Sequence, residues 1–339
     1  MSDKKLPLVS VICTIYNKEA WIGDAVESFL EQEADFEYEI LLIDDKSTDG
    51  SRKIIADYEK EHPEKIRAFY NSKNLGITRT WKKICKEAKG KYIARCDGDD
   101  YWIDNKKLQK QVDLLEKRKG SLWCCTDYDI VTPEKKLTHK SAVETGFINR
   151  PETYAEMLAT KGFTMASTWL VDTKLMKRVN NELDDMAVDD TFNIQLDLFN
   201  MTKLTYLPDS TTAYRVIVNS DSKPSDEASI EKRNERLLNT QLEYVDKYKN
   251  VQYAEMIRLL LRQDLESENR LRLVERQRKL IENQEKVVSE QNEAIKQKDK
   301  TISQKDKQIL DIQNSRRYKV GKIITSPVSV IKSVIKRRG

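Results

Sequence analysis

Three carboxylates within four residues form the group in this sequence best suited to bind a cation. Asp97, Asp99 and Asp100 follow the apolar segment 92–96 and are separated only by Gly98. Three like charges on one short loop are costly to hold together without a cation. Hard oxygen ligands suit Mg²⁺ or Mn²⁺, which complete their shell with water and substrate phosphates. An ordinary acidic turn is the alternative for this cluster taken alone.

A second acidic cluster is better suited to a nucleoside. Asp44 and Asp45 end the apolar run 39–43 and open a turn rich in Ser, Thr, Asp and Gly. An ionised carboxylate at a strand end can accept hydrogen bonds from a base N–H or a ribose hydroxyl. Since the same residue types form turns, turn chemistry alone is the alternative.

Two more polar segments could line the same crevice. Thr14, Tyr16 and Asn17 end the first apolar run, and Asn17 could also cap the helix that follows. Asn74 and Arg79 flank a glycine at a predicted helix start, where the backbone favours phosphate and an arginine adds charge-assisted hydrogen bonds. Each segment is weak evidence singly, but four polar strand ends in order are more specific.

Strand and helix signals alternate over the first 130 residues and must position these clusters. The apolar runs that predict buried strands are 8–15, 39–43, 66–70, 92–96 and 122–126. This alternation predicts a doubly wound, mainly parallel α/β sheet with ligands at the carboxyl ends of the strands. Further on, we expect helices near 153–160 and 190–200, and strands near 168–171 and 204–207.

Together these segments resemble family 2 glycosyltransferases, which have the Rossmann-like GT-A fold and use nucleotide-diphosphosugars. The matching text is VSVICTIYNKEAWIGDAVESFLEQ, EILLIDDKSTDGS, NLGITRTW and KYIARCDGDDYW, and the resemblance covers about the first 220 residues. It implies nucleobase and ribose contacts for Thr14, Tyr16, Asp44 and Asp45. Asp97 and Asp99 are implied to hold ribose and a Mn²⁺– or Mg²⁺–diphosphate, with Asp100 supporting them. The other predicted donor-site residues are Asn17, Asn74, Arg79 and Arg215.

The resemblance also implies a catalytic base. Inverting transfer needs a carboxylate beside the acceptor hydroxyl, opposite the leaving diphosphate. The family places this group at an aspartate that opens a helix, and we expect Asp190, with Asp189 as second candidate. A helix N-terminus lowers the pKa of a carboxylate and so weakens it as a base. Such a base must therefore rely on its position next to the acceptor hydroxyl. Simple capping by Asp189 is the alternative.

Two downstream residues complete the predicted site. Tyr214 and Arg215 resemble a tyrosine–arginine segment of the family that often continues into a histidine, but Ile217 stands here. Arg215 is still expected to pair with phosphate, whereas the histidine of the family pattern is missing from this position. Trp169 lies where relatives contact the acceptor, and either stacking on a sugar or a place in the core would explain it.

Charge is unevenly distributed along the 339 residues. The chain is 39% hydrophobic and 34% charged, which is too polar for one globular domain. Residues 316–339 hold eight Lys/Arg and no Asp/Glu, so a total of +4 leaves 4 − 8 = −4 on residues 1–315. An acidic body is a poor match for nucleic acid.

Several protein classes are disfavoured by other counts. There is no apolar run long enough to span a membrane and no export leader. An odd number of cysteines without a CxxC pair predicts reduced thiols in a cytoplasmic protein. The two histidines, His62 and His139, lie in polar stretches and are expected at the surface.

Residues 227–317 contain neither Gly nor Pro, which predicts one helix to about residue 249 and a long second helix. An apolar residue recurs every seven positions in the second helix, at Val274, Ile281, Val288, Ile295, Ile302 and Ile309. This repeat predicts a homo-oligomeric left-handed coiled coil, about 75 Å long, through residues 251–315. Because the next core column is mostly Gln and Lys, a solvated single helix is the alternative.

The expected domains are a catalytic unit at 1–225, a helical connector at 226–250, the stalk at 251–315 and a tail at 316–339. The tail combines Lys and Arg with an apolar helical face, which favours binding to the anionic inner surface of the cell membrane. A packing helix in the oligomer or a nucleic-acid tail are the alternatives, and the β-branched apolar residues disfavour the last.

We therefore expect an inverting, metal-dependent hexosyl- or N-acetylhexosaminyltransferase. Its donor would be UDP-linked, its acceptor a lipid-linked or surface glycan, and its location the inner face of the cell membrane. A nucleotidyltransferase is one alternative, but residues 16–19 lack the Gly-rich phosphate loop it would show. A coiled-coil scaffold with an inactive head is the other.

Overall fold

The chain divides into two compact units, Met1–Gln263 and Asp264–Gly339. The first unit contains the whole sheet and the helices that cover it. The computed structural model describes residues 6–185, 187, 190–217, 226–249 and 253–325.

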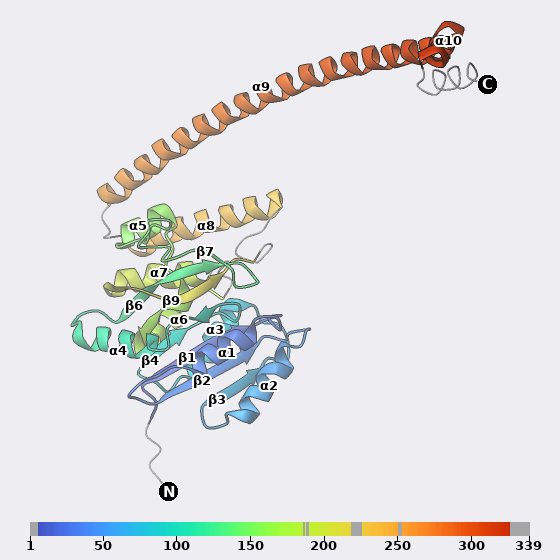
Figure 1. Cartoon of the computed structure of the whole chain (residues 1–339). Coiled ribbons are helices and arrows are strands. Elements are labelled where there is room, and N and C mark those ends of the chain that lie inside the picture. Colours follow the sequence, from blue (N-terminus) through green and yellow to red (C-terminus); the bar gives the residue numbers. More distant parts are fainter. Residues whose placement is uncertain (1–5, 186, 188–189, 218–225, 250–252, 326–339) are drawn as a thin grey trace. The chain divides into compact units, whose positions relative to one another are not determined.

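The first half of the sheet is parallel, as the apolar runs predict. Its strands lie side by side in the order β3 (Ile66–Tyr70), β2 (Tyr38–Asp44), β1 (Val9–Ile15) and β4 (Tyr92–Arg95) (Figure 1). Parallel strands put their carboxyl ends at the same edge of a sheet. The polar segments that follow β1, β2 and β4 therefore start from a common edge.

Helices bury both faces of this sheet, which is why its strands are apolar throughout. One face is covered by α1 (Ile22–Leu30), α2 (Ser51–Glu61) and α4 (Lys107–Lys117). The other face is covered by α3 (Ile77–Glu87), α6 (Thr173–Glu182) and α7 (Asp190–Met201).

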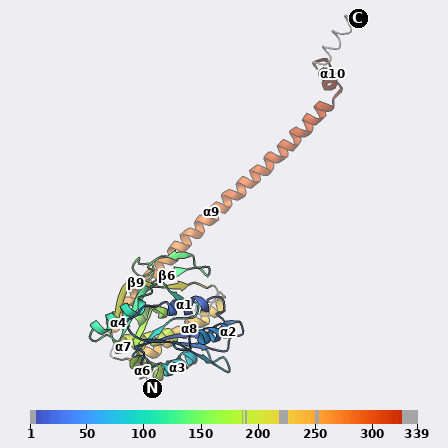
Figure 2. The same cartoon turned by 60° about the horizontal axis from the view of Figure 1, so that its bottom comes forward.

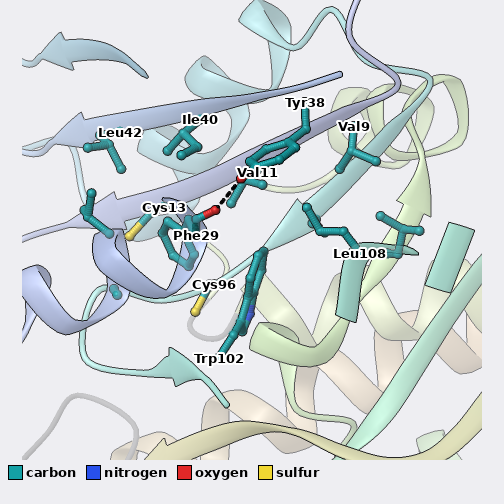
Figure 3. Close-up of a cluster of buried hydrophobic side chains, with 14 of the residues drawn as sticks. Val9, Val11, Cys13, Phe29, Tyr38, Ile40, Leu42, Cys96, Trp102 and Leu108 are labelled. Atoms are coloured by element: carbon teal, nitrogen blue, oxygen red, sulfur yellow. Dashed lines mark hydrogen bonds between the residues drawn. The ribbon is translucent and has the colours of Figure 1, made fainter. Parts of the chain in front are cut away.

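The core on the α1 face is closed by aromatic rings. Phe29 and Trp102 approach to 4.7 Å between ring centroids, beside Cys13 and Cys96 (Figure 3). The Tyr38 hydroxyl donates a hydrogen bond to the Phe29 carbonyl at 2.8 Å. Cys13 and Cys96 lie near the carboxyl ends of β1 and β4, so this cluster packs next to the start of the acidic loop.

The second half of the sheet is mixed, so the prediction of a mainly parallel sheet is wrong. Beyond β4 the order continues with β8 (Leu170–Asp172), β6 (Trp123–Val131), β9 (Leu204–Arg215) and β5 (Tyr101–Trp102), and β7 (Leu137–His139) pairs with β6. β8 is antiparallel to both β4 and β6, whereas β6 and β9 are parallel. A strand of three residues carries no sequence signal for its direction, and the alternation of elements does not reveal that β8 inserts between β4 and β6.

The less regular region keeps most of its predicted elements but changes their limits. α5 (Tyr154–Thr160) begins after Thr153, whose side chain accepts a hydrogen bond from the Glu156 N–H at 3.1 Å. The predicted strand at 168–171 is a 3₁₀ turn, η1 (Ala166–Thr168), followed by β8. β9 is longer than predicted because it pairs with β6 from Leu204 to Arg215, and near its end it also pairs with β5 beside the acidic loop.

Helix α8 (Glu227–Lys247), which covers most of the predicted connector, packs on the first unit. Tyr244 joins a buried cluster with residues of α5 and α7. The fully buried carboxylate of Asp197 accepts hydrogen bonds from the Tyr244 hydroxyl, the Tyr248 hydroxyl and Lys247, at 3.0, 2.7 and 2.8 Å. The division between the two compact units falls at 263/264, and the domain limits at 225/226 and 250/251 remain predictions.

The long Gly-free helix is present as α9 (Tyr253–Asn314), and it is followed by α10 (Arg316–Thr325) (Figure 2). The heptad residues of α9 are all more than half exposed in the single chain, including Val274, Ile281 and Ile295. The coiled coil itself remains a prediction.

None of the described helices combines the length and the apolar character needed to cross a membrane. Of the predicted tail, residues 326–339 lie outside the described residues.

Candidate active site

The ends of β1 and β2 are tied together by their loops. Asn17 does not cap α1, which starts at Ile22 without a side-chain cap, so that prediction is wrong. Asn17 instead adopts φ 54°, and its Oδ1 accepts a hydrogen bond from the Thr48 N–H at 2.8 Å. Its own N–H donates to Ser47 Oγ at 3.0 Å. Asn17 therefore joins the two loops that were predicted to line one crevice.

The acidic loop after β4 reaches the same place. A Cβ on Gly98 would lie 3.4 Å from the Thr14 carbonyl, so the loop passes directly over the end of β1. Thr14 is half-buried there, and Tyr16 is 44% exposed. The structure thus brings these three predicted polar segments together, and hydrogen bonds from the Leu75 and Gly76 N–H groups to Asp45 join the fourth to them.

The three carboxylates of this loop have different surroundings. Asp97 Oδ1 accepts a hydrogen bond from Arg95 Nε at 3.1 Å, and Asp99 Oδ2 lies 2.6 Å from Lys18 Nζ. Asp100 is buried, where it accepts hydrogen bonds from the Ser167 hydroxyl at 2.7 Å and the Arg215 N–H at 3.0 Å. Burial, and then the charges of Asp99 and Asp97, raise the pKa of Asp100 well above its usual value.

Asp97 and Asp99 fit a divalent ion that arrives with a phosphate ligand. In the part of the chain that the structure describes, no group of three or more His, Cys, Asp or Glu side chains could hold a metal alone. Mg²⁺ and Mn²⁺ are commonly bound by only one or two carboxylates, with phosphates and water completing the shell. Both side chains keep some exposure, 32% and 19%, and the Lys18 ammonium shows that a cation can sit against Asp99.

Arg95 links this loop to a distant helix, and sequence reasoning missed it. Its guanidinium is buried, with Nη1 2.7 Å from Asp190 Oδ2 and Nε 3.1 Å from Asp97 Oδ1. The guanidinium also lies over the Trp81 ring, 4.6 Å from its centroid. Burial alone would lower the pKa of Arg95, but the charges of Asp190 and Asp97 outweigh it and raise that pKa. The available signal was one charged residue inside an otherwise apolar strand.

The predicted base is therefore placed beside the acidic loop. Asp190 is the first residue of α7 and is buried against Arg95, although 95 positions separate the two residues in sequence. The second candidate, Asp189, lies outside the described residues.

Asp44, the last residue of β2, and Asp45, which follows it, differ in how many hydrogen bonds they accept. Asp45 Oδ1 accepts from Asn71 Nδ2 at 2.7 Å and from the Leu75 N–H at 2.8 Å, and its Oδ2 accepts from the Gly76 N–H at 2.9 Å. This carboxylate therefore anchors the turn that leads into α3. Asp44 Oδ1 accepts from the Ser47 N–H at 3.1 Å, whereas its buried Oδ2 has no hydrogen-bond partner.

The turn before α3 holds two more predicted donor-site residues. Asn74 Oδ1 accepts a hydrogen bond from the Gly76 N–H at 3.0 Å, and Gly76 needs its φ of 81°, which favours glycine. Arg79 is exposed on the first turn of α3, and its Nε lies 3.8 Å from Asp185. The structure thus places both residues at the helix start, as predicted.

Arg215 is buried under the acidic loop. Its Nη1 donates a hydrogen bond to the Asp99 carbonyl at 2.9 Å, and its Nη2 lies 2.7 Å from Asp24 Oδ2. The guanidinium thus supports the loop backbone, and pairing with a phosphate remains a prediction.

Trp169 is fully buried. Its Nε1 donates to Thr164 Oγ1 at 2.9 Å, and its ring packs edge-on against Trp123. In this structure Trp169 is a core residue, and an acceptor sugar would reach it only after a rearrangement.

Residues 10–179 match the family model described as glycosyl transferase family 2. The chain belongs to glycosyl transferase family 2. This confirms the family that the sequence motifs predict.

Similar family 2 proteins include the putative teichuronic acid biosynthesis glycosyltransferase TuaG of Bacillus subtilis. It is 37% identical over 137 residues, which cover 39% of this chain and 53% of TuaG. The putative glycosyltransferase EpsE of the same organism is 38% identical over 113 residues, 33% of this chain and 40% of EpsE. An uncharacterized protein of Mycobacterium tuberculosis is 35% identical over 116 residues, 34% of each chain. The match thus spans between about a third and about half of these relatives.

Solved structures show the same GT-A-like fold. The structure of Staphylococcus aureus TarS 1–349 in complex with UDP-GlcNAc aligns with a TM-score of 0.57 at 18% identity, covering 74% of this chain and 70% of that one. The mannosyltransferase PcManGT from Pyrobaculum calidifontis, in complex with GDP-Man and Mn²⁺, aligns with a TM-score of 0.50 at 12% identity, covering 77% and 81%.

Proposed function

We propose that this family 2 glycosyltransferase is an inverting, metal-dependent enzyme that transfers a sugar from a nucleotide-diphosphosugar. The observation that carries the proposal is the convergence of Asp97, Asp99 and Asp190 at one edge of the sheet, with Arg95 between Asp97 and Asp190. This is the arrangement that a donor diphosphate on one side and an acceptor on the other would require. The nucleotide-sugar complexes of TarS and PcManGT support it.

In this proposal the donor lies across the carboxyl ends of β1, β2 and β4. Asp97 and Asp99 would hold Mn²⁺ or Mg²⁺, which when bound stabilises the negative charge of the leaving diphosphate. The remaining donor contacts are assigned to Thr14, Tyr16, Asn17, Asp44, Asp45, Asn74, Arg79 and Arg215. Among these, Asp44 has a buried oxygen without a partner, as a hydrogen-bond acceptor for a nucleoside would have.

Asp190 is proposed as the general base. It takes the proton of the acceptor hydroxyl while that oxygen attacks the anomeric carbon and the bond to the diphosphate breaks. Arg95 Nη1 lies 2.7 Å from Asp190 Oδ2, so the guanidinium holds the carboxylate in place for this role. Asp189 is the second candidate for this role.

The acceptor is proposed to be a surface glycan or lipid-linked glycan, and the transferred group a hexose or N-acetylhexosamine from a UDP-linked donor. The likeness to TuaG supports a role in polysaccharide synthesis. Residues 316–339 would hold the enzyme on the inner face of the cell membrane. Vesicle flotation of the full chain, compared with a chain lacking residues 316–339, tests this, and equal flotation of both would contradict it.

A second copy of the chain is proposed to cover the apolar seam of α9. Val274, Ile281 and Ile295 recur at the heptad interval and are 59%, 54% and 54% exposed in one chain. A strict seven-residue repeat keeps such a stripe facing another helix only when the helices supercoil. Residues 251–315 would therefore form a homo-oligomer.

The decisive experiment is a screen of nucleotide-sugars for hydrolysis with and without Mn²⁺, using UDP-GlcNAc, UDP-glucose, UDP-galactose and GDP-mannose. Hydrolysis of one donor that stops with EDTA, and in Asp99→Asn, is the expected result. A thermal shift with UDP and Mn²⁺ is the companion measurement. No hydrolysis and no stabilisation by any nucleotide would instead favour a scaffold with an inactive head.

A further inference from the structure

Arg95 occupies a buried position, where a charge destabilises the fold unless it is compensated. It lies at the end of β4, between β1 and β8 in the sheet, and its side chain is buried on the face covered by α3. A buried guanidinium is tolerated only when carboxylates or other acceptors compensate it. The neighbouring strand residues Ile93 and Ala94 are apolar and buried, so packing alone does not call for an arginine here.

Two carboxylates from different parts of the chain compensate this charge. Nε faces Asp97 Oδ1 at 3.1 Å, and Nη1 faces Asp190 Oδ2 at 2.7 Å. The guanidinium is planar and rigid, so two carboxylates bound to it have a fixed separation and orientation. A lysine ammonium would supply the charge without this fixed geometry.

The aromatic layer beneath Arg95 restricts it further. The guanidinium lies 4.6 Å from the centroid of Trp81, whose Nε1 donates a hydrogen bond to Asn180 Oδ1 at 3.2 Å. Trp81 is fully buried. The ring against which the Arg95 guanidinium stacks therefore belongs to α3, and Asn180 of α6 holds that ring through its hydrogen bond. One face of the guanidinium thus packs on the Trp81 ring, while N–H groups at its edge bind the two carboxylates.

We propose that Arg95 is a positioning residue that sets the orientation of Asp190 relative to Asp97. This inference rests on the proposed function, in which Asp97 contacts the metal and Asp190 is the base. It assigns Arg95 no contact with the substrate. Arg95 acts through both carboxylates, so its loss disturbs metal binding and proton transfer together.

The test compares Arg95→Lys with wild type in the full chain. The turnover readout is kcat for hydrolysis of the best donor in the screen above. The second readout needs no turnover: Mn²⁺ affinity measured by EPR in the presence of UDP. In Arg95→Lys we expect kcat to fall at least 30-fold and Mn²⁺ affinity at least fivefold, with the melting temperature recorded to correct for folded fraction.

Arg67→Met is the matched control. Arg67 also pairs with a carboxylate, with Nη2 2.9 Å from Glu39 Oε2, but at the outer strands β3 and β2. It should lose stability while kcat and Mn²⁺ affinity stay within twofold of wild type. A further variant, Arg95→Lys combined with Asp190→Asn, should have the same kcat as Asp190→Asn alone when both are measured at saturating Mn²⁺. The effect of Arg95 on metal affinity through Asp97 is then not limiting, and its remaining effect on kcat passes through Asp190.

Retention of both values within twofold in Arg95→Lys would overturn the proposal. Loss of only one of them would also overturn it, because Arg95 would then act on a single carboxylate. If the effects of Arg95→Lys and Asp190→Asn on kcat multiply in the double variant, Arg95 does not act through Asp190. Failure of the proposed function looks different: wild type itself would bind no Mn²⁺ with UDP and hydrolyse no donor.

Discussion

Lys18 Nζ lies 2.6 Å from Asp99 Oδ2, so a side chain from the loop after β1 balances the charge of a carboxylate in the acidic loop after β4. Both side chains retain exposure, 24% and 19%, so the pair can separate without unfolding. Burial alone would lower the pKa of Lys18, but Asp99 outweighs it and raises that pKa. The Lys18 ammonium therefore occupies the position at Asp99 where the proposed metal would have to bind.

Lys18→Met should strengthen Mn²⁺ binding in the absence of nucleotide. A partly exposed ion pair contributes up to about 1 kcal/mol, so removing the competing ammonium should raise the affinity up to about fivefold. EPR titration of Mn²⁺ measures this. Lys53→Met, which removes the exposed Lys53–Asp57 pair on α2, is the control and should leave the affinity unchanged. Weaker Mn²⁺ binding by Lys18→Met would contradict the competition.

Asp190→Asn should lower kcat by about 10²–10⁴-fold, which is the usual contribution of a positioned general base. Because the amide keeps the shape of the side chain, the KM for the donor should change little. Steady-state hydrolysis of the donor measures both constants, with Asp57→Asn as a surface control. If Asp190→Asn keeps most of the activity and Asp189→Asn loses it, Asp189 is the base and Asp190 serves only to hold Arg95.

Asp44, the last residue of β2, and Asp45, which follows it, should differ in how much they contribute to stability. Asp45→Ala removes the acceptor for Asn71, Leu75 and Gly76, so the free energy of unfolding should fall by about 3 kcal/mol. Asp44→Ala removes one such bond, from the Ser47 N–H, and should cost about 1 kcal/mol. Urea unfolding of both variants measures these differences. A greater loss of stability in Asp44→Ala would contradict the assignment.

Lys107 should make stability depend on pH in an unusual direction. Its ammonium is fully buried beside Gln111 and Trp102, and burial lowers its pKa to about 8. In the unfolded chain the pKa is about 10.4, so between these values the unfolded state binds more protons. The cost of burying Lys107, about 3 kcal/mol, is therefore fully present below pH 8 and is relieved as the pH rises towards 10.5.

Lys107→Met should thus be more stable than wild type at pH 7, and its advantage should shrink towards pH 10. Urea unfolding of both proteins at pH 7, 8.5 and 10 measures the difference, in which the titration of all other groups cancels. Lys117→Met, on the same helix but 78% exposed, should show no such trend. A difference that does not change with pH would mean that Lys107 stays charged in the fold.

The parallel half of the sheet was predictable because runs such as 39–43 are apolar on both faces, which occurs where helices cover a parallel sheet on both sides. The insertion of β8 was not predictable, since three residues carry no directional signal. The acidic loop could be named from the sequence because it is a local pattern, and Asp190 because the family resemblance implies a base at an aspartate that opens a helix. Their partners could not be named, because Arg95 and Asp190 meet only after the sheet and α7 have packed.

Tertiary packing also explains why the surroundings of Asp45 and Trp169 could not be predicted from the sequence. A sequence shows that a carboxylate follows a strand, but not that three donors from the next loop will reach it. It shows a tryptophan near a strand, but not that Trp123 and Thr164 will enclose that ring. Side-chain environment is decided by tertiary packing, which gives Asp45 an anchoring role beside its proposed donor contact and gives Trp169 a place in the core.

The seam of α9 gives the last prediction. Ile295 is 54% exposed in the single chain and occupies the apolar column, whereas Lys300 lies five residues on, at the opposite side of the heptad. Ile295→Glu would place like charges against one another in an oligomer, so the assembly should dissociate to monomers in light scattering. Lys300→Glu is the control and should leave the mass unchanged. If wild type is already monomeric at micromolar concentration, the seam does not bind a second copy and α9 is a solvated single helix.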